Sequence, residues 1–303
     1  MECYGIFAIN KQEEIPMNNY VILTDSSGDL CASLMQELGV ESVSLEVNID
    51  GEEPKYNHEI VPAEFYEKLR TKIGAKTSAV SMDAFRHFFE KHLKEGKDII
   101  YLGFSSGLSV TYTNGRNAAE ELSEEYPDRK IVAIDTLCAS LGQGLLVSLA
   151  AKKQAAGASF EEVVDFVESN KLNLCHWFTV DDLFFLKRGG RVSAATAVLG
   201  TMLAIKPVMH VDNEGHLINV SKARGRRAAI VAMADKVTET GIDPNSQLMY
   251  ICHGDCLEDA ELLSSMIKEK YPDCEIMIDY TGPVIGAHSG PGTLALFFLG
   301  TER

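Results

Sequence analysis

The sequence predicts an α/β fold in two domains, a parallel-sheet N-terminal domain and a mixed α/β C-terminal domain. Two observations carry this prediction. In the first half, three short apolar, β-branched runs are each followed by a polar loop and then by a helix-like segment. In the second half, strand-like runs, a hairpin signal and two long helix-like segments alternate less regularly, which is typical of a mixed sheet.

The first half contains three consecutive strand–loop–helix units. The predicted strands are 20–24, 99–103 and 131–134, and the helices that follow them are 30–38, a segment through 119–122, and one from Ser140 towards Ala151. Gly39 is a usual signal for the end of a helix. Such units form a parallel sheet whose loops meet at its carboxyl edge, where ligands bind.

After Gly157 the pattern changes. Ser159 and Glu162 form a capping box that predicts a helix over 161–168, and the turn residues of 212–215 predict a hairpin. The further elements expected are strands over 175–180, 208–211, 217–220, 248–252 and 275–280, and helices over 82–93, 223–239 and 259–270. We therefore expect domains of residues 17–157 and 158–303, with residues 1–16 as an N-terminal appendage.

Composition excludes several classes of partner. The chain has 28 basic and 44 acidic residues and a formal net charge of −16, which argues against nucleic acid and anionic membrane surfaces. The long uncharged stretch 280–301 holds five glycines and two prolines, so no stable membrane insertion is expected. The seven cysteines are scattered and no secretory signal pattern is present, which indicates reduced thiols and a cytoplasmic location.

Hydroxyl residues gather where the predicted loops meet. The four groups are Ser26 and Ser27; Ser105, Ser106 and Ser109; Thr136 and Ser140; and Thr77, Ser78 and Ser81. Each group alone fits helix capping. Together they indicate a site for a small acidic head group, since helix N-termini favour anions. Serine-hydrolase chemistry stays an alternative, although Phe104 breaks the G-x-S-x-G pattern at Ser106 and spacing does not show a nearby histidine base.

Arg191 follows a Gly189-Gly190 pair and precedes the apolar run 192–205. Arg191 is either a surface residue whose aliphatic part covers apolar surface, or the partner of a ligand carboxylate at an apolar pocket. In the second case, the small residues of the run would leave space for the hydrocarbon tail of the ligand. Hydroxyls and a cation for the head, with apolar walls for the tail, predict an amphiphile site.

Three other motifs each have a structural and a functional interpretation. The cations Lys222, Arg224, Arg226 and Arg227 have no acid nearby in the sequence and form either a solvated helix start or a docking patch for an acidic partner. The glycine-rich stretch 286–292 predicts a rigid turn. Cys252, His253 and Cys256 lack a second ligand pair at metal-site spacing, so neither a metal nor any other cofactor is expected.

These pieces, in this order, resemble the DegV family of bacterial lipid-binding proteins. The matching motifs, from about Tyr20 to the C-terminus, are Thr24-Asp25-Ser26-Ser27; Thr77-Ser78-x-x-Ser81; Ser105-Ser106-Gly107-Leu108-Ser109-x-Thr111-Tyr112; Asp135-x-x-x-x-Ser140-x-Gly142-x-Gly144; Leu186-Lys187-x-Gly189-Gly190-Arg191; Ile205-Lys206-Pro207; Lys222-x-Arg224; and Gly286-Ala287-His288-x-Gly290-Pro291-Gly292. Departures at Ala79, Val80, Val110 and Thr136 leave the head-group donors intact but put the preferred acyl chain in doubt.

The resemblance implies a DegV-like fold that holds a long-chain fatty acid in a tunnel between the two domains. It implies that the protein is a non-catalytic carrier, which presents the acid to a separate ATP-dependent fatty acid kinase for acyl-phosphate formation. Thr77 and Ser106 would donate to the carboxylate, with Ser105 in the same cluster and Arg191 and His288 as polar support, partly through water. Lys222 and Arg224 resemble the kinase-docking region. A lipid-handling serine hydrolase and a ligand-sensing regulatory protein remain alternatives.

Overall fold

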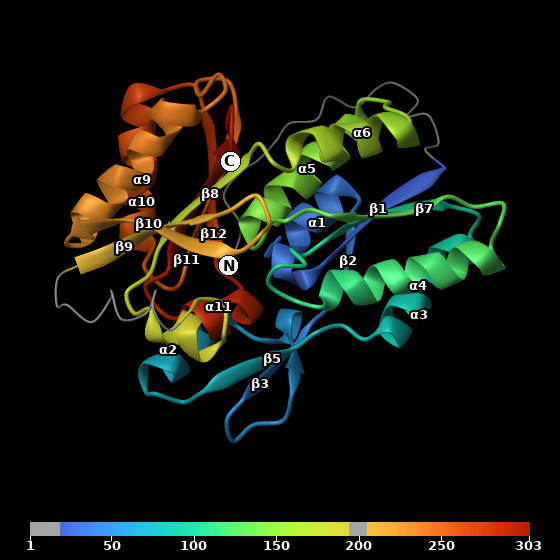
Figure 1. The fold of residues 1–303 in the computed structure, drawn as a ribbon, viewed down its shortest axis with the longest axis horizontal. Coiled ribbons are helices and arrows are strands. Elements are labelled where there is room, and N and C mark those ends of the chain that lie inside the picture. The colour runs from blue at the N-terminus through green and yellow to red at the C-terminus, as the bar shows by residue number, and fades with distance from the viewer. Residues whose placement is uncertain (1–18, 194–204) are drawn as a thin grey trace.

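The computed structural model describes residues 19–193 and 205–303, which form three β-sheets with helices between and around them (Figure 1). The first sheet has the order β2-β1-β6-β7 and is parallel throughout. Its strands are β1 (Tyr20–Asp25), β2 (Glu41–Val43), β6 (Asp98–Gly103) and β7 (Ile131–Asp135). The predicted parallel sheet of the first half is therefore confirmed, with β2 as an edge strand that the prediction lacked.

The helices of the first half begin and end close to their sequence signals. They are α1 (Ala32–Leu38), α2 (Pro62–Arg70), α3 (Met82–Lys94), α4 (Thr111–Glu125), α5 (Leu141–Ala155) and α6 (Phe160–Asn170). Gly39 ends α1 with a φ of 66°, and Ser159 and Glu162 form the expected capping box at the start of α6. Ser81 caps α3, so for this serine the capping interpretation holds.

The second sheet is mixed, as predicted, and has the order β10-β9-β8-β13-β11-β12. Its strands are β8 (Leu174–Thr179), β9 (Ile205–Val211), β10 (Leu217–Arg224), β11 (Leu248–His253), β12 (Glu275–Tyr280) and β13 (Leu294–Leu299). Only the β11–β12 pair is parallel. The prediction lacked β13, the central strand, whose uniformly apolar residues are covered on both faces and so show no alternation.

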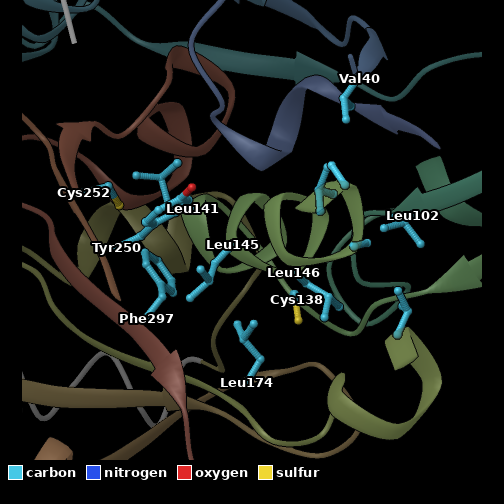
Figure 2. Close-up of a cluster of buried hydrophobic side chains, with 14 of the residues drawn as sticks. Val40, Leu102, Cys138, Leu141, Leu145, Leu146, Leu174, Tyr250, Cys252 and Phe297 are labelled. Carbon is cyan, nitrogen blue, oxygen red and sulfur yellow. The ribbon is translucent and has the colours of Figure 1, made fainter. Parts of the chain in front are cut away.

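The two faces of β13 contact different parts of the core. Leu294, Leu296 and Phe298 pack with α9 (Arg226–Thr240) and α10 (Leu257–Lys270), whereas Ala295 and Phe297 face the cluster built around α5. Helix α5 lies between the first and second sheets (Figure 1). Figure 2 shows its residues Leu141, Leu145 and Leu146 within this cluster, with Val40 and Leu102 from the first half and Leu174, Tyr250 and Phe297 from the second.

A third, small sheet was not predicted. It has the antiparallel order β4-β3-β5 and consists of β3 (Glu46–Ile49), β4 (Lys55–Tyr56) and β5 (Ala75–Ser78). Helix α11 (Pro283–Ser289), from the far end of the chain, packs against β3 and β5. Two single-turn helices, η1 (Ser26–Gly28) and η2 (Asn57–Glu59), and the short α7 (Phe184–Arg188) complete the described elements.

Some sequence expectations concern features that the structure does not address. The division into domains of residues 17–157 and 158–303 stays a prediction, as does the appendage 1–16, which lies outside the described residues. Most of the apolar run 192–205 is also outside them. Among the residues that are described, no helix is both long enough and apolar enough to cross a membrane.

Candidate ligand-binding site

A cavity of about 510 Å³ lies between the first sheet, the mixed sheet and α11. Most of its lining is apolar and comes from all three regions: Phe104, Leu108, Ala139, Phe178, Leu186, Leu217, Val284, Ile285, Ala295 and Phe297. Four of the predicted ligand-binding residues, Thr77, Ser106, Arg191 and His288, line the same cavity. A site of this volume, with a mainly apolar lining, is typical for a small ligand.

Thr77 and His288 are in direct contact although 211 positions separate them. The Thr77 Oγ1 atom lies 2.8 Å from His288 Nε2. Thr77 lies on β5 and His288 on α11, so the packing of α11 against the small sheet creates this pair. The helix also corrects the prediction of a rigid turn over 286–292, because only Gly290 and Gly292, after its end, have positive φ values.

Arg191 places a cation at the cavity. Its Nε atom donates to Leu108 O at 3.0 Å and its Nη1 atom to Gly189 O. Among the described residues no acid forms an ion pair with it, and burial lowers its pKa. A half-buried guanidinium held by backbone carbonyls favours an anion in the cavity.

His288 is neutral at physiological pH. Burial, together with the charges of Arg191 and Arg188, lowers the pKa of His288 to about 4. Its Nδ1 atom has no hydrogen-bond partner among the described residues and packs against Gly189, where a Cβ atom would come within 2.3 Å of it. With Nε2 protonated, His288 donates to Thr77 Oγ1 and leaves the threonine hydroxyl hydrogen free for a ligand.

We expect His288 to make the fold sensitive to acid. Its pKa is about 6.5 in an unfolded chain and about 4 here. Below pH 6.5 the unfolded chain binds a proton that the folded chain does not, so stability is lost as the pH falls towards 4, by about 2–3 kcal/mol at pH 4.5. Denaturant unfolding at pH 7 and pH 4.5 should show a smaller loss for His288→Gln than for the parent protein. The same loss in both proteins would contradict this assignment.

The structure separates Ser105 from the other predicted ligand-binding residues. Its side chain is fully buried, and its hydroxyl donates to Gly215 O, in the β9–β10 hairpin, at 2.9 Å. The neighbouring Gly107 fits against the same hairpin, since a Cβ atom there would lie 2.8 Å from Glu214 O. Ser105 therefore joins the loop of the first sheet to the hairpin of the mixed sheet, and Ser106 is the exposed hydroxyl at the cavity.

Two aspartates that belong to the matching motifs, but that were not predicted as ligand-binding residues, hold the loop that carries Ser106. Asp25 is buried and accepts hydrogen bonds from Tyr101 Oη at 2.8 Å, from Phe104 N at 2.9 Å and from Ser27. Burial raises the pKa of Asp25, while these donors lower it. Asp135 accepts from Ser106 N at 3.2 Å. Each is the last residue of a strand of the parallel sheet, a position at the carboxyl edge where ligands bind, and this position was a usable signal.

The other predicted hydroxyl groups do not all meet at the cavity. The Ser27 hydroxyl contacts Asp25 and lies 2.9 Å from Gln143 Oε1, and Thr136 donates to Gly103 O at 2.7 Å, so both serve the interior of the first sheet. Ser140 does line the cavity, beside Cys252. The prediction that all four groups converge on one site is therefore wrong in part, because buried hydroxyls also satisfy backbone carbonyls and side-chain amides.

The four cations divide between an edge strand and the start of a helix: Lys222 and Arg224 lie on β10, and Arg226 and Arg227 begin α9. Lys222 and Arg224 are exposed on β10, and no ion pair to either is formed within the described parts of the chain. Arg226 differs: it pairs with Asp259 at 2.8 Å and lies 3.8 Å from Asp181. The expectation of four cations with no acid nearby is thus corrected at Arg226, because folding brings distant acids to it.

These observations define a class of protein: an α/β protein with a cavity between two sheets that suits an amphiphilic, anionic ligand. The DegV family model ("Uncharacterised protein, DegV family COG1307") matches residues 19–301. A DegV domain-containing protein of Clostridium perfringens is 47% identical over 95% of this chain and 99% of its own length. The chain belongs to the DegV family.

Solved structures of this family have the same fold. A fatty-acid-binding DegV family protein from Thermus thermophilus matches with a TM-score of 0.82 and 30% identity, over 92% of this chain and 98% of its own. A DegV lipid-binding protein from Thermotoga maritima matches with a TM-score of 0.81 and 28% identity, over 95% of this chain and 100% of its own. The fold class predicted from the sequence is confirmed by these similarities.

Proposed function

We propose that this protein binds a long-chain fatty acid in the cavity between its two larger sheets and carries out no chemistry on it. The observation that carries the proposal is the shared lining: Thr77, Ser106, Arg191 and His288 border the same cavity as the apolar walls. Binding by the relatives from Thermus thermophilus and Bacillus subtilis, both described as fatty-acid-binding, supports it. An acyl chain gains roughly 0.8 kcal/mol for each methylene buried, so affinity does not require a buried ion pair.

In this proposal the carboxylate accepts hydrogen bonds from Thr77 and Ser106. The Thr77 hydroxyl is oriented by His288, and the Ser106 hydroxyl has no hydrogen-bond partner within the described residues. The positive charge of Arg191 favours a carboxylate in the cavity, and among the described residues Arg191 forms no ion pair with an acid. These donors select a carboxylate and keep it near the exposed Ser106, where another protein reaches it.

The partner in this proposal is a separate ATP-dependent fatty acid kinase, which converts the presented carboxylate to an acyl phosphate. Lys222 and Arg224 would form the docking surface, since they are exposed cations on the β10 edge of a chain with a net charge of −16. Uncompensated cations of this kind favour an acidic partner surface. The protein would work in the cytoplasm, which the six free cysteines among the described residues support.

The deciding experiment is mass spectrometry of organic extracts from natively purified protein, without added lipid. We expect about one long-chain fatty acid per chain. Well-folded protein that yields no acid, and takes up none when oleate or palmitate is added, would overturn the proposal. A fluorophosphonate probe distinguishes the hydrolase alternative, because no histidine hydrogen bond activates Ser106 among the described residues and labelling there is not expected.

A further inference from the structure

Arg303 lies behind the fatty acid cavity and is not one of the residues that line it. Its guanidinium donates to backbone carbonyls of three separate connections: Leu137 O at 2.8 Å, between β7 and α5; Lys171 O and, at 3.2 Å, Leu174 O, where α6 leads into β8; and Asp212 O at 3.1 Å, in the β9–β10 hairpin. Its Nη2 atom also contacts Cys138 Sγ at 3.2 Å. These contacts use every N–H of the guanidinium, so Arg303 ties the three connections together as a rigid fork.

Leu137 is the strained residue among these acceptors. Its φ of 54° lies in the left-handed region, which bulky side chains rarely adopt. Two hydrogen bonds hold its backbone: the carbonyl accepts from Arg303, and the N–H donates to Asp135 Oδ1 at 3.1 Å. A strained backbone persists only where its surroundings fix it, and Arg303 is one of the two groups that fix this one.

The connection that Arg303 holds is joined to the loop that carries Ser106. The Asp135 Oδ1 atom that accepts from Leu137 N also accepts from Ser106 N, at 3.2 Å. The neighbouring Ser105 N donates to Cys138 O at 3.0 Å. Because Ser106 and Leu137 share one carboxylate oxygen, a change in the conformation of Leu137 displaces the Ser106 hydroxyl at the cavity.

We propose that Arg303 is a positioning residue for the head-group site. It fixes Leu137 and the β9–β10 hairpin, and through them it holds Ser106 where its hydroxyl donates to a ligand carboxylate. Arg303 itself does not touch the ligand. This inference rests on the fatty acid binding proposed above and adds to it a residue on the far side of the cavity wall.

The test is a double-mutant cycle on the full chain, with laurate affinity measured for the parent protein, Arg303→Met, Ser106→Ala and the combination of the two. Methionine keeps an unbranched side chain and removes the fork. We expect Arg303→Met to bind laurate about fivefold more weakly, but no more than about twofold more weakly when residue 106 is already alanine, because both changes remove the same hydrogen bond. Binding of 1-dodecanol, which has the same tail and no carboxylate, should change by no more than about twofold in Arg303→Met.

Arg129→Met is the matched control. The Arg129 guanidinium also donates to a backbone carbonyl, Gly96 O, but at the amino ends of β6 and β7, away from the cavity. Both arginine variants should lower the free energy of unfolding, whereas Arg129→Met should leave laurate affinity unchanged. Equal losses for laurate and dodecanol, a full loss in the Ser106→Ala background, or the same loss in Arg129→Met would overturn the proposal. If Arg303→Met fails to fold, Arg303→Lys keeps the charge without the fork and replaces it in the cycle.

Hydrogen exchange of the ligand-free chain separates this inference from the proposed function. The amides of Ser106 and Leu137 should exchange at least about threefold faster in Arg303→Met than in Arg129→Met, since opening of their connection becomes easier. Parent protein that binds no laurate would overturn the proposed function, and the head-group role of Ser106 with it. Normal laurate binding by the parent, with unchanged exchange of these two amides in Arg303→Met, would overturn the positioning role alone.

Discussion

The double variant Thr77→Ala/Ser106→Ala is expected to bind long-chain fatty acids roughly 30- to 150-fold more weakly than the parent protein, while its fold survives. Each alanine removes a hydrogen bond to a charged carboxylate, and the two together cost about 2–3 kcal/mol. Neither hydroxyl supports the fold extensively: Ser106 is exposed, and Thr77 bonds only to His288 among the described residues. Displacement of a fluorescent fatty acid measures the affinity, and if the proposed kinase partner exists, phosphorylation of the acid should fall in parallel.

Ser105→Ala is the matched control for this prediction. It removes a neighbouring hydroxyl that bonds to Gly215 O instead of lining the cavity. We expect a lower free energy of unfolding for Ser105→Ala, and a change of no more than about twofold in fatty acid affinity. Unchanged affinity and phosphorylation in the double variant, or the same loss in the control, would refute the head-group assignment.

Ala295→Phe is expected to weaken binding of the longest acyl chains roughly a hundredfold while shorter chains bind almost as well as in the parent protein. Ala295 lies on the central strand β13, and its small side chain borders the cavity. A phenyl ring there takes space from the tail, and excluding three or four methylenes costs about 3 kcal/mol, or roughly a hundredfold in affinity. Titrations of stearate and octanoate with both proteins measure the effect.

The comparison of chain lengths is itself the control for Ala295→Phe. Stearate affinity should fall far more than octanoate affinity, since the octanoate tail needs less of the cavity. Equal losses for both acids would mean that the larger side chain disturbs β13 generally and that Ala295 does not bound the tail.

Local sequence signals predicted the elements that have strong periodicity or caps. The three strand–loop–helix units, the capping box at Ser159 and the β9–β10 hairpin are all confirmed. The sequence analysis lacked β13, because a strand buried on both faces has no alternation. The small sheet was not predicted either, since its strands have only two to four residues and α11, from the far end of the chain, packs against it.

The site was predictable as a set of residue types but not as a geometry. The family resemblance and the chemistry of the side chains predicted four ligand-binding residues that the structure brings to one cavity: Thr77, Ser106, Arg191 and His288. No local pattern distinguishes Ser105 from Ser106, because adjacent loop residues point in directions that only the opposing hairpin decides. The acids beside Arg226 are equally invisible in the sequence, since they lie 45 and 33 positions away from it.

The hairpin seated on the loop of the first sheet has a consequence for how the protein opens. Because Ser105 and Gly107 meet Gly215 across the wall of the cavity, the loop 104–109 and the β9–β10 hairpin form a seam beside the core that the two larger sheets share around α5. A bound ligand adds contacts to both sides of that seam and raises the free energy of opening it by mass action. Hydrogen exchange of the amides at 104–109 and 212–216 would then report cavity occupancy through local opening rather than global unfolding.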